Sequence, residues 1–359
     1  MNTKKYDLVV YIGRFQPFHK GHQETLRRAA HLANNVLVLI GSANGPRTIK
    51  NPWTYEERKE MVEDAGFEVV RLHTAGINDY SYNDNKWIQQ VGEKVSKVEQ
   101  KVWASKSFAD SGREKPNIAV IGHDKDHSSY YLNYFPQWDY IEMNPYPNDK
   151  ETIDSTKIRQ LMFTGHSSFA KGVVPNDTFG KEDIISSFMR TKEFAELQKE
   201  WDFVQEYKDK WSVAPYAPTF VTVDAVVEQS GHILLVQRGA FPGRGLWAMP
   251  GGFINEYERL KDAVVRELRE ETKLKVPEKV LRGSITHQDV FDDPKRSTRG
   301  RTITHAFLFQ LDNASELPRV KGNDDAMDAK WVSLAEFENM QSVMYEDHYS
   351  IVKNMLGRA

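Results

Sequence analysis

Two segments of the chain combine residue types and spacings that could act on phosphate groups. Residues 13–22 read GRFQPFHKGH, with His19 and His22 separated by a lysine and a glycine where a helix is expected to begin. Both imidazoles can face one phosphate there, and the N–H groups of a helix start favour an anion. They could stabilise charge during in-line displacement at phosphorus. Taken alone, two such histidines could also be surface residues beside a turn.

The second segment, residues 251–274, carries three carboxylates on one expected helix. Glu267, Glu270 and Glu271 are spaced so that their side chains share one helix face. Like charges so close oppose helix formation unless a divalent cation neutralises them, and Mg²⁺ or Mn²⁺ suits oxygen ligands. Such a metal binds a diphosphate, lowers the pKa of bound water and neutralises the leaving phosphate. A solvated charged helix face is the alternative for the acidic run alone.

Short apolar runs alternate with helical patterns in the first half of the chain. The runs suit strands buried on both faces and are Asp7–Ile12, Val36–Gly41, Glu68–Leu72 and Ile118–Gly122. The helical patterns between them are Gly21–Ala33, Thr54–Asp64 and Lys86–Val102. This alternation predicts an α/β domain with a parallel sheet. Ligands bind beyond the carboxyl ends of such strands, where residues 13–22 lie.

The second half has a different pattern, which predicts an α+β domain. Its expected strands and helix are Phe220–Glu228, His232–Gln237, Ile285–Phe291, Thr302–Leu311 and the helix Tyr257–Thr272. A charged helical pattern, Lys181–Trp211, lies between the halves and leads to the segment Pro215–Pro218. We therefore expect a first domain over residues 1–180, a helical linker over 181–217 and a second domain over 218–359.

The composition of the 359 residues narrows the class of protein. The net charge is only -3, so nothing favours nucleic acid or an anionic membrane surface as a partner. The absence of cysteine excludes disulfides, thiolate nucleophiles and Cys-ligated zinc, and it suits a reducing compartment. No apolar run approaches the ~20 residues that span a bilayer, and the N-terminus lacks the features of a signal peptide. These features predict a soluble cytoplasmic protein.

Residues 13–22 resemble the HxGH nucleotidyltransferase superfamily, and the fuller string resembles the archaeal-type nicotinamide mononucleotide (NMN) adenylyltransferases. Three further segments support the narrower resemblance. They are Gly41–Thr54 with Glu57-Arg58, Ile77-Asn78-Asp79 with Tyr82 and Trp87, and Ser155-Thr156-Lys157-Ile158-Arg159. The resemblance covers about residues 6–165 and implies a Rossmann-like fold with ATP and NMN as substrates.

The resemblance also implies roles for individual residues. His19, His22 and Arg159 would be catalytic. ATP would contact Gly13, Arg14, Phe15, His19, His22, Ser155, Thr156 and Arg159, and NMN would contact Arg47, Asn78 and Trp87. From the residues alone, Ser155 and Thr156 could instead cap a helix, and Trp87 could belong to the core. Asp154 stands where the family often has serine, so an extra carboxylate lies near the expected polyphosphate.

Residues 251–274 resemble the Nudix box. Gly252, Glu258 and the run Arg266–Glu271 match its spacing, whereas Lys273 stands where the box usually has glycine and shapes the helix exit. The resemblance implies that Glu267, Glu270 and Glu271 are catalytic metal ligands for Mg²⁺ or Mn²⁺. It also implies that Glu258 pairs with Arg266.

Residues 287–301 resemble a subgroup of ADP-ribose pyrophosphatases that includes Nudix-type NAD regulators. ADP-ribose would then contact Trp247, Phe291 and Arg301, although core packing or a charged loop explains these residues equally well. An NMN adenylyltransferase joined to a Nudix domain resembles known bacterial bifunctional enzymes of NAD metabolism. Nudix relatives of this kind commonly form homodimers.

Other functions compete with this interpretation. The first domain could adenylylate another phosphate ester, such as phosphopantetheine, or transfer CMP, although the string GRFQPF argues against both. The Nudix half could sense ADP-ribose without hydrolysing it, or hydrolyse another nucleoside diphosphate derivative. Regulators of that lineage usually carry a DNA-binding winged helix, and only about thirty residues follow Asp328. We therefore favour hydrolysis of ADP-ribose.

Overall fold

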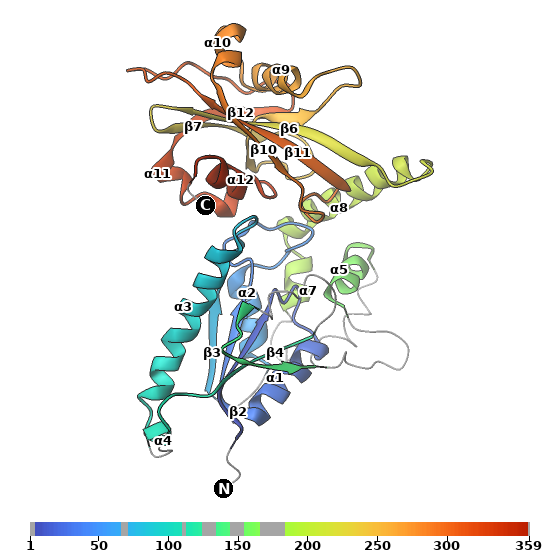
Figure 1. The fold of residues 1–359 in the computed structure, drawn as a ribbon. Helices are drawn as coiled ribbons and strands as arrows, with labels where there is room; N and C mark the ends of the chain where they lie inside the picture. The colour runs from blue at the N-terminus through green and yellow to red at the C-terminus, as the bar shows by residue number, and fades with distance from the viewer. Residues whose placement is uncertain are drawn as a thin grey trace. The chain divides into compact units, whose positions relative to one another are not determined.

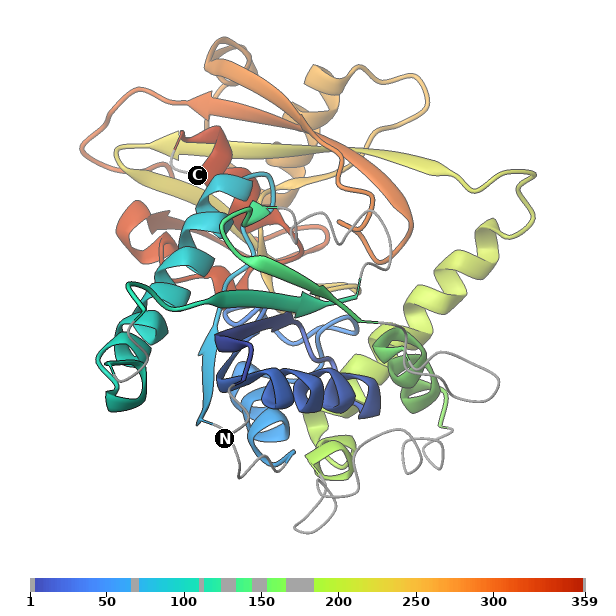
Figure 2. The ribbon, with the colours of Figure 1, turned by 60° about the horizontal axis from the view of Figure 1, so that its bottom comes forward.

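The computed structural model describes residues 4–65, 71–109, 113–123, 134–143, 154–165 and 184–357 (Figures 1 and 2). The chain divides into two compact units. The first comprises Met1–Asp79 and Asp84–Leu197, and the second comprises Tyr80–Asn83 and Gln198–Ala359. The division therefore differs from the expected separate linker over residues 181–217. It falls inside helix α8 (Lys192–Trp211), whose later residues belong to the second unit.

Parallel strands form the centre of the first unit. They are β1 (Tyr6–Gly13), β2 (Ala33–Ile40), β3 (Arg71–Gly76), β4 (Ile118–Gly122) and β5 (Asp139–Glu142), in the sheet order β3-β2-β1-β4-β5. The order reverses at β1, so the loop after β1 lies where ligands bind in open sheets of this kind. The α/β class with a Rossmann-like parallel sheet is confirmed.

Helices cover both faces of this sheet. The described ones are α1 (Lys20–Leu32), α2 (Tyr55–Glu63), α3 (Asp84–Trp103), α4 (Lys106–Ala109), α5 (Ser155–Phe163), α7 (Ile184–Met189) and the start of α8. On one face α3 buries Val91 and Val95 against Leu8 and Val10 of β1. Helix α1 packs against β1 and β2 on the other face (Figure 2).

Two features of this unit differ from the expectation. The described part of the third strand, Arg71–Gly76, continues four residues beyond the expected end at Leu72; residues 66–70, which include the expected start at Glu68, lie outside the described residues. Strand β5 was not expected, because its sequence DYIE is polar and mostly exposed, so it lacks the apolar run of a buried strand.

The second unit contains a mixed sheet, as an α+β domain requires. Its strands are β6 (Thr219–Gln229), β7 (His232–Arg238), β8 (Trp247–Ala248), β9 (Gly251–Phe253), β10 (Ile285–Phe291), β11 (Arg301–Gln310) and β12 (Ala326–Ser333). The main order is β10-β11-β6-β7-β12, with β8 paired to β7 and β9 paired to β6. Strands β11 and β6 are parallel, and the other pairs are antiparallel.

Helices lie on both faces of this sheet as well (Figure 1). They are α9 (Leu260–Thr272), α10 (Glu278–Gly283), α11 (Leu334–Phe337), a 3-10 turn (Gln341–Val343) and α12 (His348–Met355). Helix α9 buries Val264 and Leu268 on one face, and α12 buries Ile351 and Val352 on the other. The expected helix start at Tyr257 is wrong, because the Glu258 carboxylate accepts from Asn255 N–H and holds this segment as a turn.

None of the described helices is both long enough and apolar enough to span a membrane.

Candidate active sites

The loop after β1 makes a tight turn around Phe15. Phe15 is buried with a positive φ of 52°, and its ring packs against those of Tyr11 and His22. A Cβ atom on Gly13 would lie 2.7 Å from the Phe15 ring, so this position requires glycine. The aromatic packing thereby sets the direction from which the chain enters α1.

The two histidines meet at the start of α1, as the sequence predicts. Their rings stack with centroids 3.7 Å apart, and His19 is almost fully buried. The backbone N–H of His19 donates to Nδ1 of His22 at 3.2 Å. Because that nitrogen accepts, a neutral His22 carries its proton on Nε2, which can donate to a ligand oxygen. The pair can therefore present an imidazole donor to a phosphate.

Arg159 and its neighbours on α5 lie against the same loop. Arg159 donates to the carbonyl oxygen of Gln16 at 2.6 Å, and Ser155 Oγ donates to that of Pro17 at 3.3 Å. Burial, together with the nearby charge of Arg14, lowers the pKa of Arg159 to about 10. The two positive charges of Arg14 and Arg159 favour a polyphosphate, although the carboxylate of Asp154 acts on Arg159 in the opposite sense.

The N-cap of α5 is Asp154, whose carboxylate accepts from Thr156 N–H at 2.8 Å. Ser155 and Thr156 are therefore not the capping residues, and their hydroxyls belong to the first helical turn. Thr156 Oγ1 accepts from Arg159 at 3.2 Å. The departure at position 154 thus has a structural reason, since aspartate is as good an N-cap as serine.

Arg58 is a buried residue of this site to which the sequence assigned no role. Only 1% of it is exposed, and it donates to the carbonyl oxygens of Arg14 at 2.7 Å, Gly41 at 2.6 Å and Ser42 at 3.1 Å. Burial lowers its pKa to about 10. Arg58 therefore ties the loop after β1 to the loop after β2. The signal that the sequence offers is the Glu57-Arg58 pair, which belongs to the stretch that resembles the NMN adenylyltransferases.

The residues expected at NMN make other contacts in the structure. Arg47 forms a bidentate ion pair with Glu57, at 2.7 and 2.8 Å. The backbone of Asn78 exchanges two hydrogen bonds with the Gln90 amide. Trp87 packs against the hydrophobic core beside the sheet, which agrees with the alternative that it is a core residue.

Tyr82, which the sequence grouped with Asn78 and Trp87, belongs to the second unit. There its hydroxyl donates to Asp347 at 2.6 Å, and Asp347 forms a buried bidentate ion pair with Arg296, at 2.9 Å for both contacts. Burial alone would raise the pKa of Asp347, but Arg296 holds it below its usual value. No sequence pattern indicated this cluster, because its members come from three distant segments.

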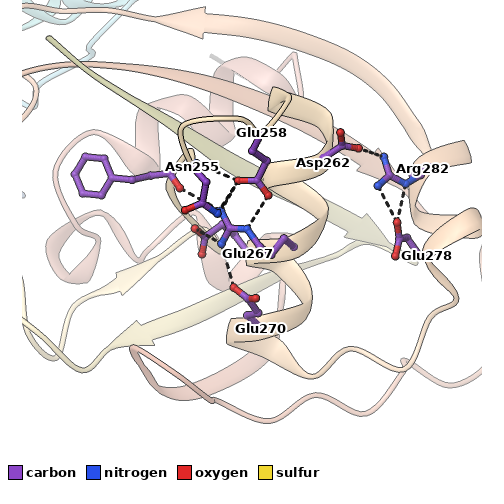
Figure 3. Close-up of polar contacts among 9 residues, drawn as sticks. Asn255, Glu258, Asp262, Glu267, Glu270, Glu278 and Arg282 are labelled. Carbon is purple, nitrogen blue, oxygen red and sulfur yellow. Dashed lines mark hydrogen bonds and ion pairs between the residues drawn. The ribbon is translucent and has the colours of Figure 1, made fainter.

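The second candidate site centres on Arg266. Its guanidinium forms two hydrogen bonds with Glu258, both 2.8 Å, so the expected pair is confirmed. It also donates to Glu267 at 2.8 Å and to Glu270 at 3.0 Å. Figure 3 shows the three carboxylates close together at the start and along one side of α9.

The third carboxylate, Glu271, points into the unit. It is 9% exposed and accepts from Gly251 N–H at 3.0 Å, and burial raises its pKa to about 8. Burial likewise raises the pKa of Glu267. A Cβ on Gly252 would lie 2.6 Å from Glu267 Oε1, so this glycine leaves room for the carboxylate.

These oxygens suit a divalent cation in charge and chemistry. Buried carboxylates are costly unless a positive charge compensates them. Nevertheless, the described residues contain no group of three His, Asp or Glu side chains arranged around one metal position. The reason is visible: Arg266 holds Glu267 and Glu270, while Glu271 is turned to Gly251. Arg266 contacts one oxygen of Glu267 and one of Glu270, so the other oxygen of each carboxylate can face a cation.

Of the residues expected at ADP-ribose, Phe291 and Trp247 belong to the same hydrophobic cluster, whereas Arg301 is paired with Asp292. Phe291 is 2% exposed and lies in the core, on the α12 face of the sheet. Trp247 is partly buried, with Lys330 Nζ 4.5 Å from its ring centroid. Arg301 donates to the backbone carbonyl and the carboxylate of Asp292. Phe291 therefore cannot stack on a ligand without leaving the core.

Comparison with known proteins follows the division of the chain. The cytidylyltransferase-like family matches residues 10–161, and the Nudix domain family matches residues 218–355. A nicotinamide/nicotinic acid mononucleotide adenylyltransferase of Acinetobacter baylyi is 32% identical over 202 residues, which are 55% of this chain and 94% of that protein. An ADP-ribose pyrophosphatase of Methanocaldococcus jannaschii is 33% identical over 141 residues, 39% of this chain and 75% of that protein.

Solved structures match both halves of the chain together, and one of them has a bound ligand and metal ion. It is a bifunctional NMN adenylyltransferase/ADP-ribose pyrophosphatase from Francisella tularensis, complexed with AMP and a manganese ion. The identity is 37%, the TM-score is 0.86, and the match covers 98% of this chain and 99% of that one. The chain therefore belongs to the family of bifunctional proteins that join an NMN adenylyltransferase to a Nudix ADP-ribose pyrophosphatase.

Proposed function

We propose that the first unit transfers the adenylyl group of ATP to NMN, giving NAD and pyrophosphate, and that the second hydrolyses ADP-ribose to AMP and ribose 5-phosphate. The full-length likeness to the Francisella bifunctional protein carries this proposal. The two sites support it independently, because each holds charged groups suited to its own reaction.

In the first reaction, a phosphate oxygen of NMN attacks the α-phosphorus of ATP. The bond between the α-phosphorus and the bridging oxygen breaks, and pyrophosphate leaves with that oxygen. His19 and His22 would stabilise the charge on the α-phosphate, since the Nε2 proton of His22 can be donated. Gly13 and Phe15 shape the ATP-binding loop, and the positive field of Arg14 and Arg159 would hold the leaving pyrophosphate.

The other assignments of the first site rest on the resemblance of its sequence to the NMN adenylyltransferases. Ser155 and Thr156, on the first turn of α5, would contact the β- and γ-phosphates. We assign NMN to Arg47, Asn78 and Trp87. Arg47 would do this while it remains paired with Glu57, which fixes its guanidinium in one orientation.

In the second reaction, water attacks one phosphorus of the diphosphate and the bridging oxygen leaves with the other phosphate. A divalent cation, for which we propose Mg²⁺ with Mn²⁺ as the alternative, would bind the diphosphate and lower the pKa of the attacking water. Glu267, Glu270 and Glu271 would hold it. The Gly251 N–H positions Glu271, and the hydrogen bonds to Glu258 would hold Arg266 beside the cation.

Product analysis tests both assignments on purified protein. ATP should be supplied with NMN, nicotinate mononucleotide or phosphopantetheine in parallel, and ADP-ribose should be supplied with Mg²⁺ or Mn²⁺. NAD with pyrophosphate, and AMP with ribose 5-phosphate, are the expected products. Turnover of phosphopantetheine alone would refute the first assignment. Tight binding of ADP-ribose without metal-dependent release of AMP would make the second unit a sensor.

A further inference from the structure

A pocket of about 380 Å³ lies in the second unit, where α8 ends and where β6 and β11 begin. Its lining includes Lys208, Trp211, Phe220, Arg299 and Arg301. Small-molecule sites usually have volumes of about 300–1,000 Å³, so this pocket can accept part of a nucleotide. Sequence reasoning assigned Trp211 to a linker and gave it no role.

An exposed aromatic face lines the pocket. Trp211 is 45% exposed, although tryptophan is mostly buried in proteins. Its ring meets the Phe220 ring edge-on, with centroids 5.3 Å apart, so the packing holds the indole in place. A fixed indole that is open on one side offers a surface on which a planar base can stack.

The polar groups of the pocket are basic. Three cationic side chains occur among the lining residues that the structure describes; Arg301 is paired with Asp292, which lies outside the lining, and Lys208 and Arg299 form no ion pair with a carboxylate of the lining. The Nε atom of Arg299 is buried, and no hydrogen bond to it is found within the described residues. A buried donor of this kind calls for an acceptor, and a phosphate or ribose oxygen would supply one. An adenine nucleotide combines an aromatic base with negatively charged phosphates, so the aromatic and basic groups of the pocket suit it.

Phe253 lies between the pocket and helix α9, which carries Glu267 and Glu270. The Phe220 and Phe253 rings meet at 5.8 Å, and the guanidinium of Arg299 lies 4.8 Å from the Phe253 ring centroid. Phe253 directly follows Gly252, against which Glu267 packs, and its carbonyl oxygen accepts from Arg266 at 3.2 Å. A nucleotide whose base occupies the pocket would therefore extend its diphosphate towards the candidate metal ligands.

A second, larger pocket fits a base less well. It has a volume of about 680 Å³, lies beside α9 and includes Glu270 in its lining, but no aromatic side chain lines it. Its Arg269 and Arg282 are both paired with Glu278. The combination of a stacking face with an unsatisfied cationic donor is found in the smaller pocket.

We propose that the pocket beside Trp211 binds the adenine base of ADP-ribose, with Trp211 stacking on the base and Arg299 and Arg301 contacting its phosphates. This inference rests on the proposed function of the second unit. It replaces Phe291 and Trp247 as the adenine-binding residues and makes the end of α8 part of the hydrolase site.

Steady-state kinetics of the full chain test this pocket. Trp211→Ala should raise the KM for ADP-ribose about 10- to 100-fold, with kcat changed less than about twofold, because a stacking contact holds the substrate and not the reacting phosphorus. Trp211→Phe should restore most of the affinity. Trp103→Ala, which removes another exposed tryptophan from the first unit, should leave the KM unchanged.

A direct binding experiment tests the adenine pocket separately from the proposed hydrolase function. AMP, titrated without metal, should quench the fluorescence of the wild-type protein and leave that of Trp211→Phe nearly unquenched. AMP should also compete with ADP-ribose more strongly than ribose 5-phosphate does. The pocket-filling variant Ala217→Trp should weaken AMP binding if Trp211→Ala does not fold.

Two results would overturn the inference. If ADP-ribose is hydrolysed and both Trp211→Ala and Ala217→Trp keep the wild-type KM, the pocket is not the adenine site, although the proposed function stands. If ADP-ribose is not hydrolysed at all, the AMP titration still decides: equal quenching in the wild-type protein and Trp211→Phe rejects the pocket.

Discussion

At the scale of single residues, buried arginines organise the first site through backbone carbonyls. Arg58 reaches the loops after β1 and β2, and Arg159 reaches the carbonyl of Gln16. A guanidinium has several donors in a rigid plane, so one side chain can satisfy several acceptors and fix the loops that carry them. The histidines depend on this frame because they stand at the end of the same loop.

Replacing Arg58 tests that role. Arg58→Met should lower the free energy of unfolding by about 3 kcal/mol, because it leaves buried carbonyl oxygens without donors. It should also slow adenylyl transfer. Urea unfolding and the NAD assay measure these effects. Lys59→Met removes an exposed cation from the same helix and should change stability by less than about 0.5 kcal/mol. Similar losses in both variants would contradict the role of Arg58.

Gly252 offers a test in the second site. An added methyl group would collide with the Glu267 carboxylate, so Gly252→Ala should slow ADP-ribose hydrolysis at least about tenfold, which corresponds to about 1.4 kcal/mol. Adenylyl transfer should not change. Gly283→Ala places its methyl group in open space and serves as the control. Full hydrolase activity in Gly252→Ala would show that Glu267 does not need its observed position.

Residues of the sites were predictable where they lie together in one short sequence motif. The pairing of His19 with His22 follows from positions close in sequence, and that of Glu258 with Arg266 follows from the resemblance to the Nudix box. The structure brings each pair together. Arg58 and the Arg296–Asp347 pair could not be predicted in the same way. Their partners come from distant segments and meet only through the tertiary fold.

At the scale of elements, the end of α9 shows how one departure from a family pattern changes the backbone. Lys273 is the C-cap of α9 and adopts a left-handed conformation, with φ 49° and ψ 28°. That conformation favours glycine, which is the usual residue of the Nudix box at this position. The lysine is therefore accommodated at some cost in stability.

Lys273→Gly should stabilise the second unit by about 1 kcal/mol by relieving this conformation. The expected effect is a higher midpoint in urea unfolding, with hydrolase activity retained. Lys275→Gly changes a nearby lysine whose φ is not positive, and it should lower stability slightly because glycine gives the unfolded chain more freedom. If Lys275→Gly stabilises the protein and Lys273→Gly does not, the left-handed conformation of Lys273 is not a source of instability.

The carboxylates of helix α9 lead us to expect that a divalent cation stabilises the protein. Divalent cations should raise the melting temperature of the wild-type protein, because a ligand present at 100 times its Kd adds about 2.7 kcal/mol to the folded state. Glu267→Gln should lose this increase. Glu278→Gln, which alters a neighbouring carboxylate paired with arginines, should keep it. Equal increases in all three proteins would place the cation elsewhere.

Most elements were predictable because they are amphipathic or continuously apolar. Strands β1, β2 and β4 and helix α3 lie within a few residues of the expected ranges. The polar strand β5 carries no such signal. The false helix start at Tyr257 arose because a side-chain-capped turn precedes α9, which composition does not distinguish from a first helical turn.

At the scale of the whole molecule, the central claim is that one chain carries two separate reactions. The two sequence signatures predicted two domains, but the division inside α8 was not predictable from composition, because the helical pattern is continuous across it. Each unit has its own sheet and its own charged site. The claim therefore requires that either activity can be removed without the other.

The most direct measurement assays both reactions in His19→Ala, in Glu270→Gln and in the wild-type protein. NAD formation from ATP and NMN, and AMP formation from ADP-ribose with Mg²⁺ or Mn²⁺, are followed on the same preparations. We predict that His19→Ala loses at least about 99% of NAD formation and keeps AMP formation, and that Glu270→Gln does the reverse. Loss of both activities in either folded variant, or of neither, would contradict two independent active sites.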